Sequence, residues 1–376
     1  MRYFSLRSLF TGAMVGLWLL VACSTDPVSP PEAQAPPRAA AQVGSSEQPV
    51  TITAGGGPVL LDPPPEPTTV KRAQYLMGTI AEITAVAAHE TIAQEAVTAG
   101  FQEIRRLEQL LSTWIETSEL SQVNRAAGRE RVPVSPETFE LLTRAVEMGE
   151  LTGGAFDITV GPAVRLWNVT EGQRVPSAME LAIAAQYVDY RLIQLDSKNR
   201  TVFLSKPGIQ IDVGGIGKGY AAERAATAMQ GAGAGGGLVA IAGDFRTFGR
   251  RADGTAWPVG LQHPRKRDAV LATLDASDEA VSTSGDYERF FVQNGVRYHH
   301  ILNPRTLMPA RLCQSVTIVA PDATMADALA TGVFVMGPVT GLALVERLKL
   351  GAVVVDANGR VTVSSRLRSR VDDTPY

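Results

Sequence analysis

Lys218 closes the glycine-rich stretch Asp212-Val-Gly-Gly-Ile-Gly-Lys218, directly before a pattern that predicts a helix. Backbone N–H groups at a helix start bind anions, and a lysine adds positive charge, so one interpretation is a phosphate site. The other is a tight strand-to-helix turn that needs glycine for its backbone angles. The stretch is not a Walker A loop, because Gly219 stands where that loop needs Ser or Thr.

Asp327 and Thr331 lie four residues apart in a second predicted helix, so their oxygens project from one face of it. Such a pair could hold a hard cation together with backbone carbonyls and substrate phosphates. Local hydrogen bonding near a helix N-terminus explains the same pair without a metal, and both interpretations stay open. The four histidines and two cysteines have no zinc-ligand spacing, so zinc is not expected.

His300 follows His299 at the end of a predicted strand and precedes the turn signal Asn303-Pro304. Histidine titrates near neutral pH, so a residue placed here can act as a general base. An ordinary surface or hydrogen-bonded role is the alternative. No Gly-x-Ser-x-Gly motif or Ser/His/Asp signature supports hydrolase-type nucleophilic catalysis.

The elements that must position these groups mix helices and strands in an irregular order, which favours an α+β domain over a doubly wound sheet. Apolar spacing predicts a helix over residues 92–111, and capping signals at Ser135-Pro136 and Ser177-Ala-Met-Glu180 open two more. Further helices are predicted over residues 219–229, 325–336 and 340–348. Strands are predicted over residues 201–204, 210–213, 238–242, 258–262, 270–274, 316–319 and 352–355.

The composition excludes several classes of protein. The chain has 376 residues, 45% hydrophobic and 19% charged, with a mean hydropathy of +0.04, so it is neither a polytopic membrane protein nor a disordered chain. The isoelectric point near 5.9 indicates no nucleic-acid surface. Two cysteines cannot build a disulfide scaffold, and Cys313 is expected to be a buried thiol.

Residues 1–22 have the features of an export signal, with Arg2 and Arg7 before an apolar run that is short for a spanning helix. The sequence Leu20-Val-Ala-Cys23 resembles a bacterial lipoprotein box, which predicts lipidation at Cys23. An ordinary secretory signal with an incidental cysteine is the alternative. Residues 24–67 hold 11 of the 23 prolines, so we expect residues 23–70 to form a disordered tether.

Seven short motifs, in order over about residues 73–365, resemble the ApbE family of bacterial FAD:protein FMN transferases. The resemblance implies a single catalytic domain related to the T-fold, which we place at residues 71–368, before a C-terminal tail at 369–376. The motifs are Met77-Gly-Thr79, Ser112-Thr-Trp114, Gly154-Ala-Phe-Asp-Ile-Thr-Val-Gly-Pro162, Asp212-Val-Gly-Gly-Ile-Gly-Lys-Gly-Tyr220, Ser282-Thr-Ser-Gly285, His300-Ile-Leu-Asn-Pro304 and Ala326-Asp-Ala-Leu-Ala-Thr331.

The resemblance also implies roles for particular residues. A backbone oxygen at Gly215 would hold Mg2+ together with Asp327 and Thr331, and His300 would take part in substrate binding and catalysis. The residues that would line the FAD site are Met77, Trp114, Ala155, Phe156, Asp157, Asp212, Lys218 and Leu302.

The implied reaction uses FAD as a substrate. The enzyme moves the FMN half onto a Thr or Ser hydroxyl of an exported protein through a phosphoester bond, with Mg2+ as cofactor, and releases AMP. Subunits of ion-translocating NADH:quinone oxidoreductases are acceptors of this kind. An FAD-binding or scavenging lipoprotein and a Mg2+-dependent FAD pyrophosphatase are the alternatives. With Cys23, the resemblance places the domain on a bacterial membrane, facing the periplasm.

Two residues depart from the family pattern. Leu307 and Ala242 stand where family members usually have glycine. A branched side chain resists a positive φ, so we expect Leu307 to alter the turn that positions His300.

Overall fold

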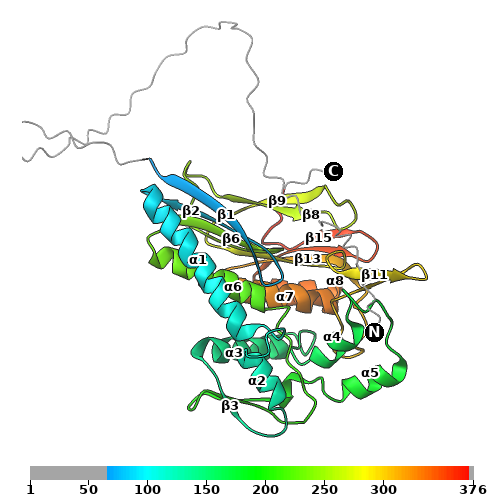
Figure 1. The fold of residues 1–376 in the computed structure, drawn as a ribbon. Coiled ribbons are helices and arrows are strands. Elements are labelled where there is room, and N and C mark those ends of the chain that lie inside the picture. The colour runs from blue at the N-terminus through cyan, green and yellow to red at the C-terminus, as the bar shows by residue number, and fades with distance from the viewer. Residues whose placement is uncertain (1–65, 372–376) are drawn as a thin grey trace, which may run out of the picture. The chain divides into compact units, whose positions relative to one another are not determined.

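Eight antiparallel strands form the central sheet of residues 66–371, the part of the chain that the computed structural model describes (Figure 1). Their order across the sheet is β1-β2-β6-β7-β10-β13-β14-β15. Their bounds are Thr68–Leu76 (β1), Thr79–Ala87 (β2), Gly236–Ile241 (β6), Asp244–Phe248 (β7), Ala280–Gly285 (β10), Cys313–Ala320 (β13), Gly351–Asp356 (β14) and Val361–Val363 (β15).

Four helices cover one face of this sheet: α1 (Glu90–Leu111), α6 (Gly217–Gly231), α7 (Ala323–Met336) and α8 (Pro338–Arg347) (Figure 1). α1 buries the predicted stripe that includes Val97, Phe101 and Ile104. α7 is buried along most of its length, and Asp322 caps it by accepting a hydrogen bond from Met325 N at 2.7 Å. The core of the domain therefore lies between the helices and the sheet.

A hairpin of β8 (Trp257–Gln262) and β9 (Val270–Ala276) covers the opposite face. Side chains alternate between the faces, as the pleat of a strand requires. In β13, Ile318 packs into the core on the helix side, whereas Val319 packs against the hairpin.

The remaining elements lie beyond the helix layer or beside the sheet (Figure 1). Ser118, Ser135 and Ser177 cap three of these helices through their side chains, and Ser177 forms a complete capping box with Glu180. The elements are α2 (Glu119–Arg125), β3 (Val132–Pro133), α3 (Pro136–Leu151), α4 (Gly161–Trp167), α5 (Ala178–Ala185), η1 (Tyr190–Leu192), β4 (Ile193–Asp196), β5 (Thr201–Leu204), β11 (Phe290–Gln293) and β12 (Val296–His299).

The α+β prediction is confirmed, but the predicted strand at residues 210–213 is wrong. Only Gln210 makes an isolated bridge, with Val160. The reason is that Asn124 takes over the next backbone groups: its side chain accepts from Ile211 N at 2.7 Å and donates to Ile211 O at 3.0 Å. The chain therefore stays extended here without joining a sheet.

The folded unit extends a little beyond the expected domain boundaries. β1 begins at Thr68, and Arg370 pairs with Glu279 at 2.7 Å near the C-terminal end. The predicted signal peptide, Cys23, residues 24–65 of the predicted tether and residues 372–376 lie outside the described residues. Within residues 66–371, no helix is both long enough and apolar enough to cross a bilayer.

Cys313 is buried in β13, as expected. Burial raises the pKa of its thiol to about 12, so it stays protonated and unreactive at neutral pH.

Candidate functional site

Lys218, at the start of α6, forms a partly buried ion pair with Asp244. Lys218 Nζ donates to Asp244 Oδ2, and Ser282 Oγ donates to the other oxygen of the same carboxylate. Although burial lowers the pKa of Lys218, the carboxylates of Asp244 and Asp327 raise it above its ordinary value. Lys218 therefore keeps a positive charge that can attract an anion at the start of α6. The backbone N–H groups there already have partners within the protein, such as Val213 O for Gly217 N and Asp327 for Gly219 N.

Asp327, Thr331 and Gly215 converge next to this pair. Asp327 is only 3% exposed, and its Oδ2 accepts from Gly219 N at 2.9 Å. A Cβ atom added at Gly215 would lie 3.0 Å from Thr331 Oγ1, so the loop before α6 contacts α7 closely. Ser284 Oγ lies 3.1 Å from the same Thr331 oxygen. The three predicted cation ligands are thus brought together.

The donor chemistry at this point fits a hard cation such as Mg2+. The predicted ligands offer a carboxylate, a hydroxyl and a backbone carbonyl, all oxygens, and a single carboxylate leaves positions for phosphate oxygens and water. Burial, followed by the nearby Asp244 carboxylate, raises the pKa of Asp327, which a bound cation would counteract. No group of three or more His, Cys, Asp or Glu residues that could hold a metal occurs in residues 66–371.

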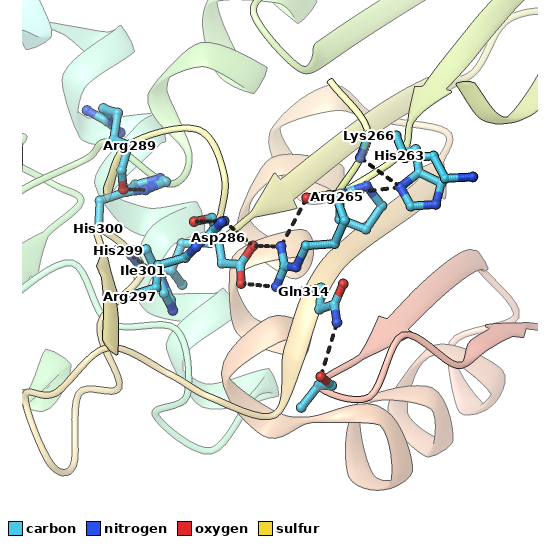
Figure 2. Close-up of polar contacts among 12 residues, drawn as sticks. His263, Arg265, Lys266, Asp286, Arg289, Arg297, His299, His300, Ile301 and Gln314 are labelled. Atoms are coloured by element: carbon cyan, nitrogen blue, oxygen red, sulfur yellow. Dashed lines mark hydrogen bonds and ion pairs between the residues drawn. The ribbon is translucent and has the colours of Figure 1, made fainter. Parts of the chain in front are cut away.

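His299 and His300 use their ring nitrogens differently; Figure 2 shows His300 beside the Arg289 carbonyl. His299 Nε2 lies 2.7 Å from the Ala310 carbonyl oxygen, and its Nδ1 accepts from Ile301 N at 3.2 Å, so both nitrogens are occupied. His300 Nδ1 lies 3.3 Å from the Arg289 carbonyl oxygen, which can only accept, so Nδ1 carries the proton. His300 Nε2 keeps its lone pair, with no hydrogen-bond partner among the described residues.

Burial and the neighbouring Arg289 hold the pKa of His300 well below its ordinary value of 6.5. The positive charge of Lys218 lowers it further, which places His300 within electrostatic reach of the Lys218 cluster. Burial also raises the pKa of Glu288, which the charge of Lys218 partly offsets. His300 is therefore neutral at physiological pH, the state that a general base needs.

Ala155, Phe156 and Asp157 form a buried segment against α7. The Phe156 ring would lie 3.3 Å from a Cβ at Gly215, so this segment reaches the predicted cation ligands. The Asp157 carboxylate accepts hydrogen bonds from Thr159 N at 2.8 Å and Tyr190 N at 2.9 Å. The Asp157 side chain therefore fixes the backbone of this segment, and Phe156 brings the segment next to Gly215.

Asp212 lies in the loop before α6, where its Oδ1 accepts from Gly214 N at 2.8 Å. This bond orients the glycine-rich loop that carries Gly215. Asp212 N in turn donates to Ile158 O at 2.7 Å, which joins the loop to the segment after Phe156.

The other predicted FAD ligands lie on separate segments. Trp114 is 84% exposed on the loop between α1 and α2, so its ring is not core packing and is available to a ligand. Met77 follows β1 with a φ of 52°, and its N–H donates to Glu108 at 2.7 Å. Leu302 packs in a small cluster with Trp167 and Leu307. None of Met77, Trp114 and Leu302 is joined to the Lys218 cluster by a hydrogen bond or ion pair.

Tyr220, the aromatic residue at the end of the glycine-rich motif, is a core residue, unlike the exposed Trp114. It is fully buried in α6, and its hydroxyl donates to Glu140 at 3.0 Å. Core packing therefore explains this aromatic, which is not a platform for a flavin.

The sequence analysis did not single out Asp244, Ser282, Ser284, Glu288 or Arg289 as site residues. Ser282 and Ser284 alternate along β10, a pattern that puts both on one face of a strand. That spacing was available in the sequence, whereas the pairing of Asp244 with Lys218 depends on β7 lying beside α6.

Known proteins are similar to this chain in sequence and in fold. The ApbE family model matches residues 77–354. A protein of Klebsiella pneumoniae (strain 342) named FAD:protein FMN transferase is 34% identical over 282 residues, which cover 73% of this chain and 87% of that protein. The ApbE protein of Thermotoga maritima superposes with a TM-score of 0.75 at 35% identity, covering 81% of this chain and 99% of that one. The flavin transferase ApbE from Vibrio cholerae superposes with a TM-score of 0.73 at 28% identity, with the same coverage.

Proposed function

The chain belongs to the ApbE family, and from that premise we propose that it is an FAD:protein FMN transferase, an enzyme that moves FMN from FAD onto a protein. The observation that carries the proposal is the state of His300. Its ring is neutral, its Nδ1 is bound to the Arg289 carbonyl, its Nε2 has no hydrogen-bond partner among the described residues, and Lys218 lies within electrostatic reach. A free imidazole base within reach of a lysine suits phosphoryl transfer to a hydroxyl.

In the proposed reaction, FAD lies with its pyrophosphate at the N-terminus of α6. Lys218 supplies positive charge to the phosphates, and Asp244 with Ser282 holds the lysine in place. Trp114 offers an exposed ring for stacking on the flavin or adenine. The segment from Ala155 to Asp157 and the loop at Asp212 border the same site.

His300 Nε2 accepts the proton of a Thr or Ser hydroxyl from the acceptor protein. The hydroxyl oxygen then forms a bond to the phosphorus of the FMN half, and the bond from that phosphorus to the bridging oxygen breaks. AMP leaves with the bridging oxygen, and the acceptor keeps FMN as a phosphoester. Gly215, Asp327 and Thr331 would hold Mg2+, which supplies charge neutralisation at the pyrophosphate.

The cellular setting is also a proposal. The lipoprotein box at Cys23 and the proline-rich residues 24–67 support a domain exported and anchored to a bacterial membrane, facing the periplasm. Its acceptors would be exported proteins, such as subunits of ion-translocating NADH:quinone oxidoreductases.

The test is to incubate the chain with FAD, Mg2+ and an exported acceptor domain, then separate the proteins by denaturing gel and record flavin fluorescence. A fluorescent acceptor band that depends on Mg2+ supports the transferase. Free FMN and AMP without a labelled band would identify an FAD pyrophosphatase instead. Unchanged FAD that stays bound would identify a flavin-binding protein.

A further inference from the structure

The β11–β12 hairpin has both of its ends in the proposed site. Glu288 and Arg289 directly precede β11, and His300 directly follows β12. The register pairs Phe290 with His299, so the first residue of β11 lies opposite the neighbour of the proposed base. A polypeptide segment bound along the hairpin would therefore have one end close to His300.

The two faces of this hairpin are unequal. On the inner face, Phe291 and Tyr298 stack at 5.3 Å between ring centroids, and Tyr298 stacks on the buried Trp167 at 5.5 Å. On the outer face, Phe290 is 40% exposed and Val292 is 59% exposed. His299, which lies opposite Phe290 on the outer face, is buried against Phe334 at the base of the hairpin. The hairpin is thus anchored by its inner face and by this base, and the exposed Phe290 and Val292 are not needed for that purpose.

Phe290 is held in a fixed orientation. The Arg297 guanidinium lies 4.0 Å from the centre of its ring, and Arg297 Nη1 is 3.4 Å from Asp286. Asp286 in turn accepts two hydrogen bonds from Arg265, at 2.6 and 2.7 Å (Figure 2). A preordered aromatic loses little conformational entropy when a partner covers it, which is the property of an interface anchor.

We propose that the outer face of the β11–β12 hairpin, formed by Phe290, Val292 and Arg297, docks the acceptor protein as an extended segment along β11. This inference rests on the proposed function, since that reaction must bring a polypeptide hydroxyl to His300. Among the described strands, β11 pairs only with β12, so its outer edge can accept a further strand. The main chain supplies the pairing, and apolar side chains of the acceptor contact Phe290 and Val292.

The experiment measures acceptor binding separately from transfer. A fluorescently labelled peptide with a central Thr, flanked by apolar residues, is titrated with the full chain in the presence of FAD, and its anisotropy gives the Kd. Phe290→Ser and Val292→Ser are compared with Val339→Ser, a control at an 83% exposed valine in α8. FAD affinity and thermal stability are recorded for each variant, and the KM for the peptide is recorded wherever transfer occurs.

We expect each hairpin variant to weaken peptide binding by about tenfold or more, as for an interface anchor, with FAD affinity unchanged and Val339→Ser like the wild type. Equal peptide affinity in all variants, no peptide binding by the wild type, or an equal loss of FAD affinity would overturn the docking surface. A hairpin-dependent Kd without transfer would keep the surface and refute the proposed reaction. A change in oligomeric state or in vesicle binding with the peptide Kd intact would assign the face to another partner.

Discussion

At the scale of single residues, the two adjacent histidines differ in whether a ring nitrogen is free to accept a proton. His299 has both ring nitrogens engaged, whereas His300 has one. Residue type and position in the sequence could predict a histidine base here, but not which of the two histidines has a free ring nitrogen. That distinction depends on the carbonyls of Ala310 and Arg289, which the fold brings to the rings.

His300→Ala should slow FMN transfer by about 10²–10⁴-fold, the usual contribution of a general base, and leave FAD affinity unchanged. Single-turnover transfer and a fluorescence titration of FAD measure the two effects. His89→Ala is the control, because His89 is exposed and makes no side-chain cap bond at the start of α1. If the His300→Ala variant transfers FMN at the wild-type rate, His300 is not the general base.

The pH dependence follows from the lowered pKa of His300. A base works in its neutral form, which exists above its pKa, so lowering the pKa extends activity toward acidic pH. With Mg2+ saturating, so that Asp327 stays ionised, we expect kcat/KM to stay flat down to pH 6.5 and to fall only well below it. Arg289→Gln removes a cation that depresses the pKa, so its acidic limb should move to higher pH. A wild-type limb at or above pH 6.5 would contradict this account.

Asp327→Asn should abolish both activity and the response to Mg2+, because Asp327 is the only anionic ligand proposed for the cation. Thr331→Val should weaken Mg2+ activation, whereas Thr331→Ser, which keeps the oxygen, should retain it. Titrating Mg2+ against transfer rate tests all three variants. An Asp327→Asn enzyme that still responds to Mg2+ would place the cation elsewhere.

At the scale of elements, the turn at Leu307 shows how the chain accommodates a departure from its family. Leu307 adopts a φ of 56°, the left-handed backbone that a branched side chain resists. Left-handed backbone costs a non-glycine residue about 1–2 kcal/mol. Burial of Leu307, together with a 2.7 Å hydrogen bond from Trp167 Nε1 to its carbonyl, offsets that cost.

Trp167→Phe should therefore lower the free energy of unfolding by about 1–3 kcal/mol, because the Leu307 carbonyl loses its buried donor. Transfer should slow as well, since this turn follows His300. Urea unfolding and transfer rates measure the two effects. Trp257→Phe is the matched control: its indole also donates to a buried carbonyl, that of Phe248, but lies away from the turn. Equal transfer rates in the two variants would show that the turn does not contribute to catalysis.

The elements that the sequence predicted are those with local signals. Serine caps and apolar stripes define α1, α3 and α5 in the sequence and in the structure. β10 was missed because Ala280-Val-Ser-Thr-Ser-Gly285 is rich in small polar residues typical of turns. Those hydroxyls are satisfied only by distant partners, such as Asp244 for Ser282 and Thr317 for Thr283. Local composition could not reveal partners that the fold supplies.

At the scale of the whole molecule, the site is assembled from segments far apart in the chain. The start of α6, the strands β7 and β10, one face of α7 and the end of β12 meet around Lys218, Asp327 and His300. The motifs in the sequence identified most of these residues through their resemblance to a family. The charge balance that fixes their protonation states arises only when these segments are packed together.

The measurement that tests the central claim most directly is the mass and stoichiometry of the transfer products. An exported acceptor domain with an exposed threonine is incubated with the chain, FAD and Mg2+, then analysed by intact mass spectrometry while AMP and FMN are quantified. We predict an acceptor heavier by one FMN, one AMP released for each attached FMN, and no gain when the acceptor threonine is replaced by valine. AMP accompanied by an equal amount of free FMN, with the acceptor mass unchanged, would contradict the account.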